Sequence, residues 1–257
     1  MSKAKISITI ITLNEEDNIA RCLDSVAWAD DVVVVDSGSK DRTLEISREK
    51  GARVFTNPWK GYGQQKNFAQ DQTKNDWVLN IDADEVVSED LKNEILAILK
   101  LDAAGQLEAR GFAVPRRTFY LGKWILNGGW YPNYLVRLAN KKSARWSEPE
   151  IHEALEVQGL VQRLQSDLEH FTFEGIEDQV LANLKYAKLG ARELNRKHRR
   201  PSLLKQILKP GWKFFETYIL KSGWKDGWAG FVISVNAAYS IFLKFSFQLE
   251  ESFKEEK

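Results

Sequence analysis

The chain has 257 residues, of which 43% are hydrophobic and 28% are charged, and its formal net charge is +1. This globular composition and length allow a substantial core, which excludes disordered and fibrous proteins. The one cysteine, Cys22, can form neither an internal disulfide nor a thiolate metal cage, which excludes structural zinc, iron–sulfur and disulfide-rich secreted proteins. The apolar run Ile6–Leu13 is too short for a signal peptide or a membrane span, so we expect an unexported protein in a reducing compartment.

Three short apolar runs rich in β-branched residues predict buried parallel strands at Ile6–Leu13, Asp31–Val35 and Trp77–Ile81. Between and after them, apolar residues recur at the spacing typical of helices, over residues 19–26, 44–50 and 91–99. Alternating strands and helices predict a parallel sheet covered by helices, so residues 1–104 form one expected α/β unit. Helix boundaries are expected at two N-cap residues and one C′ glycine, which are Asp41, Ser88 and Gly51.

The later part of the chain shows two further patterns. From Gly111 to Phe173 it is punctuated by glycine and proline, which favours strands and long loops. After Ile176 the apolar spacing is helical again, with breaks expected at Pro201 and at Pro210–Gly211. We therefore expect a first domain, made of residues 1–104 and 105–175, and a helical extension of residues 176–257.

The C-terminal extension combines positive charge with apolar residues. Residues 185–226 contain twelve Lys and Arg against three Asp and Glu. Lysines alternate there with Leu, Ile, Trp and Phe, which suits a surface helix on anionic lipid; the alternative is a charged helix packed on the main domain of a soluble protein. Residues 228–247 are apolar but contain Ser, Asn and Lys, so we expect an interfacial or core-packed helix rather than a bilayer span. No RNA- or DNA-binding module is recognisable, so we expect no nucleic-acid partner.

Polar and acidic residues follow each predicted strand: Asn14–Glu16, Asp36–Asp41 and Asp82–Glu85. Parallel α/β sheets bind ligands outside the carboxyl ends of their strands, so these carboxylates are expected to meet at one edge. The sequence has neither a glycine-rich dinucleotide loop after the first strand nor a P-loop, and carboxylate oxygens favour Mg²⁺ or Mn²⁺. For the Asp82-x-Asp84 pair alone, the alternative is a solvated turn at a helix N-terminus.

Three segments together resemble the family 2 glycosyltransferases of GT-A fold: ISITIITLNEE at residues 6–16, VDSGSKDRT at 35–43 and NIDADE at 80–85. Trp146, Ile151–Glu153 and Gly223–Phe231 resemble the branch that includes the β-1,4-glucosyltransferases of lipopolysaccharide core assembly. The resemblance implies an α/β, GT-A (nucleotide-diphospho-sugar transferase) fold with a mixed, mainly parallel sheet. Residues 1–175 would be the transferase domain, with a nucleotide-sugar half (1–104) and an acceptor half (105–175), and residues 176–257 a membrane-associating helical extension.

The resemblance also implies a donor site. It places the nucleotide base near Thr12, Asn14 and Asp36, with Glu16 close to the same pocket. The Asp-x-Asp motif would put Asp82 near the ribose or the metal, and its second aspartate on the metal, which makes Asp84 the expected metal ligand.

Lys66 is expected to contact the nucleotide phosphates as a point charge. It lies in a stretch where related enzymes place a basic or amide contact to the nucleotide, together with Gln64 and Asn67. The alternative for these residues is a solvated helix face.

Sugar transfer with inversion needs a base that takes the proton of the acceptor hydroxyl, and Glu153 is the expected base. The alternative is that Glu153 pairs with an arginine such as Arg137. His152 is a possible metal or acceptor ligand, the alternative being a surface strand histidine. Trp130 and Tyr131 follow a glycine pair and are expected to bind the acceptor sugar, although core packing is the alternative for tryptophans in this region.

We therefore expect a Mg²⁺- or Mn²⁺-dependent inverting hexosyltransferase. The resemblance implies transfer of glucose from UDP-glucose to a lipid-linked saccharide, the heptose of the lipopolysaccharide inner core, by a cytoplasmic protein peripheral on the inner membrane face and bound to its anionic surface. One alternative is transfer of another sugar, such as rhamnose or galactose, to a different cell-envelope glycan. The other is a non-catalytic nucleotide-sugar-binding module.

Overall fold

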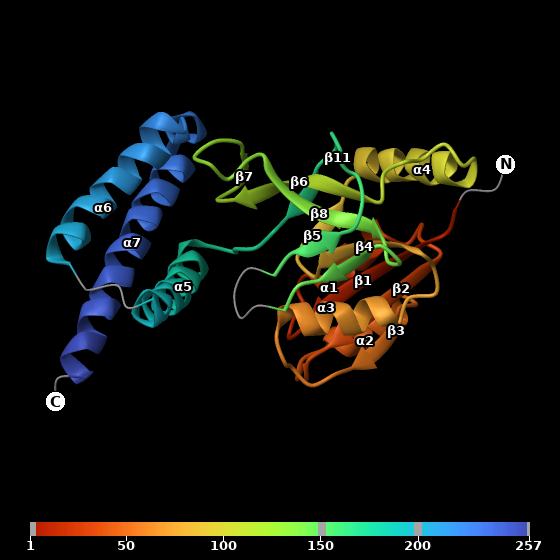
Figure 1. Cartoon of the computed structure of the whole chain (residues 1–257), viewed down its shortest axis with the longest axis horizontal. Coiled ribbons are helices and arrows are strands. Elements are labelled where there is room, and N and C mark those ends of the chain that lie inside the picture. Colours follow the sequence, from red (N-terminus) through yellow and green to blue (C-terminus); the bar gives the residue numbers. More distant parts are fainter. Residues whose placement is uncertain (1–3, 149–152, 198–201, 256–257) are drawn as a thin grey trace. The chain divides into compact units, whose positions relative to one another are not determined.

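The computed structural model describes residues 4–148, 153–197 and 202–255 and divides into two compact units (Figure 1). The first unit comprises residues 1–116 and 133–170, and the second comprises residues 117–132 and 171–257. Residues 117–132, which we expected in the acceptor half, are thus grouped with the helical extension. Each unit is described by itself below.

The first unit is built on a mixed sheet, as expected, with strand order β3–β2–β1–β4–β8–β6–β12–β5. The first four strands in that order are parallel: β1 (Ile6–Thr12), β2 (Asp31–Asp36), β3 (Arg53–Thr56) and β4 (Trp77–Asp82). The sheet continues through β5 (Glu85–Val87), β6 (Gly111–Tyr120), β8 (Asn133–Asn140), β11 (Val161–Arg163) and β12 (Leu168–His170). A separate two-stranded sheet pairs β9 (Ala144–Trp146) with β10 (Leu155–Val157). The three predicted strands are confirmed.

The central strand β1 is buried on both faces, which is why its sequence reads as a continuous β-branched run. Ile6, Ile8 and Ile10 are fully buried in the main apolar cluster of the unit. The alternate residues Ser7 and Thr9 are buried as well, and their hydroxyls donate hydrogen bonds to side chains of β2 and β4. The polar residues of this strand therefore tie the sheet together rather than facing water.

Helices α1 (Ile19–Ser25), α2 (Thr43–Glu49) and α4 (Glu89–Ala103) confirm the three helices predicted for this unit. A further helix, α3 (Tyr62–Asp71), was not predicted. Its buried side is mainly polar and includes Gln65, Lys66, Asn67 and Gln70, so the usual apolar periodicity of a packed helix is missing. The solvated helix face considered for this stretch is wrong for Lys66 and Asn67, which are buried, while Gln64 is exposed.

Two of the three predicted helix boundaries are confirmed. The Ser88 hydroxyl caps α4 by accepting the Leu91 N–H at 3.2 Å, and Gly51 follows the last residues of α2 with φ of +79°. Asp41 lies one residue before the N-cap position of α2, yet its carboxylate accepts the Thr43 N–H at 3.0 Å. It therefore performs the capping contact from the neighbouring position.

The second unit is mainly helical, as expected, with α5 (Ile176–Arg196), α6 (Leu203–Phe215) and α7 (Gly227–Glu255). A π-helical turn, η1 (Glu216–Leu220), and a 3₁₀ turn, η2 (Gly223–Asp226), join α6 to α7, which packs against both other helices (Figure 1). Strand β7 (Lys123–Ile125) forms a hairpin with the end of β6. The expected break at Pro210–Gly211 is wrong because α6 continues through Pro210, and the helix becomes irregular later, at η1.

Asp226 explains why the hairpin segment 117–132 groups with the helices. This buried carboxylate accepts the Asn127 N–H at 2.9 Å and the Asn127 side-chain amide at 3.0 Å, and the Leu126 N–H lies at 3.4 Å. Tyr120 adds a second link, because its hydroxyl donates to Gln179 of α5 at 2.7 Å. The segment is thus held by buried polar contacts as well as by apolar packing.

Candidate active site

The carboxyl ends of β1, β2 and β4 lie side by side, as the sequence predicts. In the strand registers, Thr12 is paired with Asp36, and Ile11 is paired with Asp82. Three of the expected donor residues therefore end adjacent strands at one edge of the sheet. This edge is the usual ligand-binding position of an open parallel sheet.

The loops after β1 and β2 are joined by hydrogen bonds between side chains and backbone. The Asn14 carboxamide oxygen accepts the Lys40 N–H at 2.8 Å, and the Asn14 N–H donates to the Ser39 hydroxyl at 2.8 Å. The Glu16 carboxylate accepts the Arg42 N–H at 3.0 Å. Asn14 has φ of +55°, a left-handed conformation that asparagine tolerates better than most residues. Asn14 and Glu16 thus shape the loops around the edge.

Asp36 closes the loop that follows β2. Its fully buried carboxylate accepts the N–H groups of Gly38 at 2.7 Å and Ser39 at 2.9 Å, and also the Ser39 hydroxyl. Beside it, Thr12 is buried, and its hydroxyl is without a hydrogen-bond partner among the described residues. A buried hydroxyl of this kind normally finds its partner in water or a ligand. Thr12 is therefore suited to contact a bound molecule at this edge.

Asp82 is the centre of an ion-pair cluster. One carboxylate oxygen lies 3.2 Å from the Lys66 ammonium, and the other lies 2.6 Å from the Arg137 guanidinium. Burial alone would raise the pKa of Asp82, but the positive charges of Arg137 and Lys66 outweigh it and hold the pKa well below its usual range. Asp82 is therefore ionised at all physiological pH values, with both oxygens engaged.

Arg137, on β8, forms ion pairs with two carboxylates of this cluster. Its guanidinium lies 2.7 Å from Glu85, which is fully buried, as well as contacting Asp82. Burial would lower the pKa of Arg137, but the two carboxylates raise it above its ordinary value. The alternative for Glu153, an ion pair with an arginine such as Arg137, is therefore right about an ion pair but not about the partner, which among the described residues is Lys66. Glu85 also accepts the Asp82 N–H at 2.9 Å and so fixes the Asp-x-Asp turn.

Lys66 joins Asp82 to the expected base. Its ammonium lies 3.3 Å from the Glu153 carboxylate and 4.5 Å from the centre of the Trp146 ring. The Lys66 side chain is only 8% exposed. Lys66 of α3, Asp82 at the end of β4 and Glu153 before β10 thus lie in contact with one another. Three predicted site residues are therefore brought together, while the roles predicted for them stay predictions.

The next residue of α3 holds the segment that leads toward residues 149–152. Asn67 accepts the Trp146 N–H at 2.9 Å, and its amide donates to the Trp146 carbonyl at 3.0 Å and to Glu148 at 2.9 Å. The Trp146 indole N–H donates to Asn80 at 3.2 Å. Hydrogen bonds to its backbone and to its indole N–H therefore fix the orientation of Trp146, whose ring faces Lys66. His152 lies outside the described residues.

Asp84 faces His170, which the sequence left without a role. The His170 Nε2 atom lies 3.2 Å from the Asp84 carboxylate, because β12 pairs with β5 and places His170 opposite Glu85. The described residues contain no group of three or more His, Cys, Asp and Glu side chains arranged to hold a metal by themselves. Mg²⁺ is commonly held by one or two carboxylates together with substrate phosphates, and a carboxylate such as that of Asp84 suits Mn²⁺ as well, while a neutral imidazole can also bind a metal. Asp84 and His170 therefore fit a metal site that a bound diphosphate completes.

The surrounding charge also favours a cation. Burial raises the pKa of Glu15, and the negative charges of Asp84, Asp41 and Asp82 raise it further, against the hydrogen bond from Asn18. Burial is the main cause of this shift, and only the smaller part that comes from the three aspartates reports a negative potential at this edge. A divalent cation bound there would relieve the repulsion among these carboxylates.

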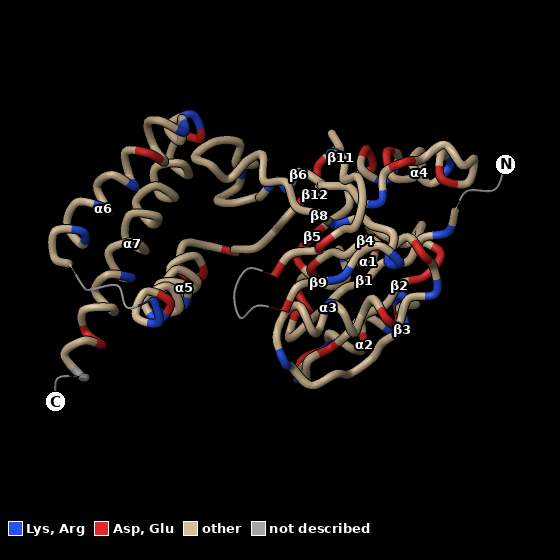
Figure 2. The backbone as a smooth tube through the Cα atoms, viewed as in Figure 1, with Lys and Arg blue, Asp and Glu red and all other residues tan. Residues whose placement is uncertain are grey.

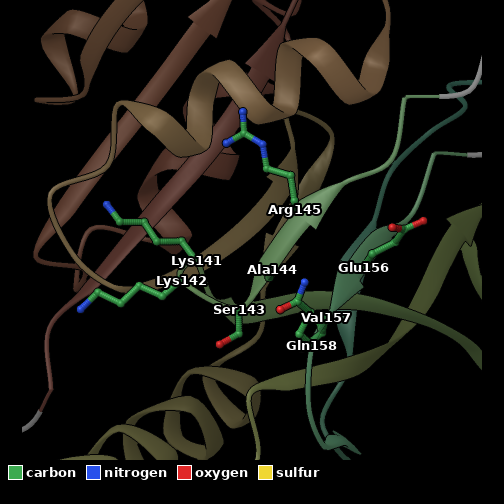
Figure 3. A pocket seen from close by; sticks show the side chains of 8 residues that line it. All are labelled: Lys141, Lys142, Ser143, Ala144, Arg145, Glu156, Val157 and Gln158. Atoms are coloured by element: carbon green, nitrogen blue, oxygen red, sulfur yellow. The ribbon is translucent and has the colours of Figure 1, made fainter.

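A cavity of about 500 Å³ lies at the other end of the sheet (Figure 3). The last residue of β8, Asn140, is paired with the first residue of β4, Trp77. Lys141 and Lys142, which line the cavity, follow Asn140, so the cavity lies where β4 begins rather than where it ends. Its cationic groups already have partners, because Lys142 lies 2.6 Å from Asp76 and Lys141 donates to the Thr73 carbonyl at 2.7 Å. This cavity is therefore not part of the carboxyl-edge site.

Trp130 and Tyr131 belong to the second unit. Trp130 is half-buried, with its ring centre 5.8 Å from that of Tyr120 and 6.2 Å from that of Phe173. Gly128 and Gly129 do form a left-handed turn before it, with φ of +66° and +83°. The Trp130 ring is thus packed in an apolar cluster, and acceptor binding by this pair stays a prediction.

Comparison with known proteins identifies the family. Residues 7–138 match the family model Glycosyl transferase family 2. The chain is 33% identical over 252 residues to an uncharacterised glycosyltransferase of Rickettsia bellii (strain RML369-C), covering 93% of this chain and 84% of that protein. It is 30% identical over 248 residues to the lipopolysaccharide core biosynthesis glycosyltransferase LpsC of Rhizobium meliloti (strain 1021), covering 94% and 90% of the two chains.

Among solved structures, glucosyl-3-phosphoglycerate synthase from Mycobacterium tuberculosis, in complex with Mn²⁺, UDP and glucosyl-3-phosphoglycerate, is 26% identical with a TM-score of 0.36, covering 46% of this chain and 45% of that one. The family match and the mixed α/β sheet confirm the predicted GT-A fold and the predicted enzyme class. The chain belongs to glycosyltransferase family 2.

Proposed function

We propose that the protein transfers glucose from UDP-glucose, with inversion, to a lipid-linked saccharide at the cytoplasmic face of the inner membrane. The heptose of the lipopolysaccharide inner core is the proposed acceptor. The name of the LpsC relative, which is similar over nearly the whole chain, supports a role in lipopolysaccharide core synthesis. The observation that carries the proposal is the meeting of Lys66, Asp82 and Glu153 at the carboxyl edge of the sheet.

The nucleotide would bind across the ends of β1 and β2. The Thr12 hydroxyl, which has no hydrogen-bond partner in the described part of the chain, is the proposed contact to the base, beside Asp36, and Asn14 and Glu16 hold the flanking loops in place. Lys66 is the proposed contact to the diphosphate, because a buried ammonium attracts phosphate oxygens strongly. Asp82 would then hold Lys66 in reach of the phosphates and accept a ribose hydroxyl.

Asp84 and His170 are the residues that would hold Mg²⁺ or Mn²⁺. When bound, the cation supplies charge neutralisation to the departing nucleoside diphosphate. The protein's own part is to keep the two ligands together, which the pairing of β5 with β12 does.

Glu153 is the proposed catalytic base. The acceptor oxygen forms a bond to the anomeric carbon, the bond from that carbon to the diphosphate oxygen breaks, and the hydroxyl proton passes to the Glu153 carboxylate. The Lys66 ammonium orients this carboxylate, and Asn67 positions the segment from which Glu153 extends. Attack from the face opposite the leaving group inverts the configuration at the anomeric carbon.

The test is hydrolysis of a panel of nucleotide sugars by the purified protein, with and without Mn²⁺ or Mg²⁺. We expect turnover of UDP-glucose that requires the metal and is lost in Asp84→Asn. Asp90→Asn, an exposed aspartate at the start of α4, is the matched control and should retain turnover. Turnover of a nucleotide-linked rhamnose or of UDP-galactose instead of UDP-glucose would contradict the proposed donor.

A further inference from the structure

Helix α6 carries an apolar face that the second unit leaves open. The residues of this face are between 59% and 71% exposed, and they are Leu203, Leu204, Ile207, Leu208 and Trp212. At 3.6 residues per turn they lie within about half of the helix circumference. Large apolar side chains gathered on one exposed face mark a binding surface, whereas scattered ones do not. We name these five residues the α6 apolar face.

Helix α6 packs on α7 through side chains that lie beside the α6 apolar face. Gln206 donates to the Ser246 hydroxyl at 2.6 Å, and the Phe214 ring centre lies 6.0 Å from that of Phe231. In the described part of the unit the α6 apolar face stays exposed, although other side chains of α6 pack on α7.

The charge beside this face is uniformly positive on the helix itself. α6 contains lysines at 205, 209 and 213 and carries neither Asp nor Glu (Figure 2). Lys209 and Lys244 both lie near the face of the Phe245 ring, at 5.8 and 5.5 Å. Burial lowers the pKa of Lys244, and the nearby charge of Lys209 lowers it further, against the attraction of Glu193. The positive charge beside α6 thus extends onto the neighbouring part of α7.

Helix α7 raises the question of a membrane span. Residues 223–253 are long and apolar enough to cross a bilayer, with a mean hydropathy of 1.4 in the most apolar window. However, the polar groups of α7 bond to α5: the buried Asn236 amide donates to Gln179 at 2.6 Å. Asn195 of α5 donates to Glu251 of α7 at the far end of the same interface.

A spanning α7 would take α5 into the hydrocarbon with it. The charged residues of α5 are Glu177, Asp178, Lys185, Lys188, Arg192, Glu193 and Arg196. Each such side chain opposes insertion by several kcal/mol at the bilayer centre, on the order of +3 kcal/mol by translocon scales. These charged neighbours oppose insertion of α7 as a bilayer span, although only 33% of its most apolar window is buried by the described residues.

We propose that the α6 apolar face lies in the headgroup region of an anionic phospholipid bilayer, with Lys205 and Lys209 of the same helix on the lipid phosphates, while α7 stays outside the hydrocarbon core. A long amphipathic helix with lysines flanking an apolar face is the usual form of an interfacial membrane helix. Trp212 supports this position because tryptophan favours the membrane–water interface. The inference builds on the membrane location in the proposed function, but lipid binding is measured independently of sugar transfer.

The experiment is flotation of the full-length protein with vesicles of phosphatidylcholine alone and of phosphatidylcholine with phosphatidylglycerol. We expect binding that requires phosphatidylglycerol and weakens with added salt, because salt screens the lysine–phosphate attraction. Ile207→Glu should lower the partition coefficient at least tenfold, and the loss of one positive charge in Lys205→Gln about fivefold. Leu101→Glu, at an exposed leucine of α4 in the first unit, is the matched control and should bind like the wild type.

Three results would overturn the proposal: equal binding to both kinds of vesicle, unchanged binding by Ile207→Glu, or retention of the protein on vesicles after an alkaline carbonate wash, which a spanning α7 would give. Because Ile207 is 71% exposed, its replacement should leave the fold intact, and a thermal melt checks this. Donor hydrolysis separates the two hypotheses. If Ile207→Glu loses lipid binding but still hydrolyses UDP-glucose, the proposed donor and the membrane inference are both supported. If the wild type hydrolyses UDP-glucose but does not bind vesicles, only the membrane inference is refuted.

Discussion

Replacing Arg137 by methionine should destabilise the first unit more than any other single charge removal at the site. Arg137 is 3% exposed and lies 2.6 Å from Asp82 and 2.7 Å from Glu85. Its loss leaves Glu85, which is fully buried, with the Asp82 N–H at 2.9 Å and, as its cationic partner among the described residues, Arg116 at the longer distance of 3.4 Å. Removing one partner of a buried ion pair typically lowers the free energy of unfolding by about 3–5 kcal/mol, so we expect a loss in that range for Arg137→Met.

The measurement is denaturant unfolding of wild type and variants, followed by tryptophan fluorescence at several pH values. The pKa of Asp82 is held below its usual range in the folded protein, so this pairing stabilises the fold at neutral pH. The stabilisation is lost as the pH falls below about 4, where Asp82 of the unfolded chain becomes protonated. The difference between wild type and Arg137→Met should therefore be largest at neutral pH and smaller in acid.

Two further variants make this prediction specific. Arg145→Met removes an arginine that is 55% exposed and paired with an exposed aspartate, Asp71, so it should lower the stability by only about 0–1 kcal/mol. Arg137→Met combined with Glu85→Gln should recover part of the loss, because the uncompensated carboxylate is then gone. A loss for Arg137→Met no larger than that for Arg145→Met would refute the reasoning.

Three other predictions concern the site and the helical unit. Glu153→Gln should lower sugar transfer to the acceptor by about 10²- to 10⁴-fold with unchanged UDP binding by calorimetry, and near-normal transfer would remove Glu153 as the base. His170→Ala should raise the Mn²⁺ concentration needed for half-maximal donor hydrolysis at least tenfold, whereas an unchanged metal dependence would assign His170 a purely structural contact with Asp84. Gly230→Ala should lower the thermal midpoint, because a Cβ there would lie 1.8 Å from the Gly223 carbonyl oxygen. Gly211→Ala is the control: a Cβ there would have no atom within 4 Å, so this variant should raise or maintain the midpoint. Equal effects of the two substitutions would contradict the packing described for this turn.

The strands and the acidic edge were predictable because their causes are local. A run of β-branched residues such as Asp31–Val35 indicates a buried strand wherever it occurs, and the residues after it must lie at the strand's carboxyl end. Asp36 and Asp82 could therefore be placed at one edge before their neighbours in space were known. The GT-A resemblance added the roles, which the geometry does not by itself assign.

The parts that the sequence did not predict depend on contacts between distant segments. Helix α3 has a polar buried side, so periodicity could not identify it. His170 reaches Asp84 through the pairing of β12 with β5, and Arg137 reaches Asp82 from β8, neither of which has a signal in spacing. Pro210 shows the opposite error: a strong local signal for a helix break was overridden by the packing of α6 on α7.

Side chains of α3 form hydrogen bonds with the backbone of strand β9, and this makes the helix and the strand unequally tolerant of mutation. Asn67 bonds to the peptide N–H and carbonyl of Trp146, and Gln70 donates to the carbonyl of Ala144 at 2.8 Å. Peptide groups are the same for every residue except proline, so these bonds would survive many side-chain changes on the strand. The helix has less freedom, because at Asn67 a carboxamide both donates and accepts at that reach, and at Gln70 a donor of similar length is needed. In a collection of random variants, substitutions at Asn67 and Gln70 should therefore be depleted, while Ala144 is constrained only by the space around it.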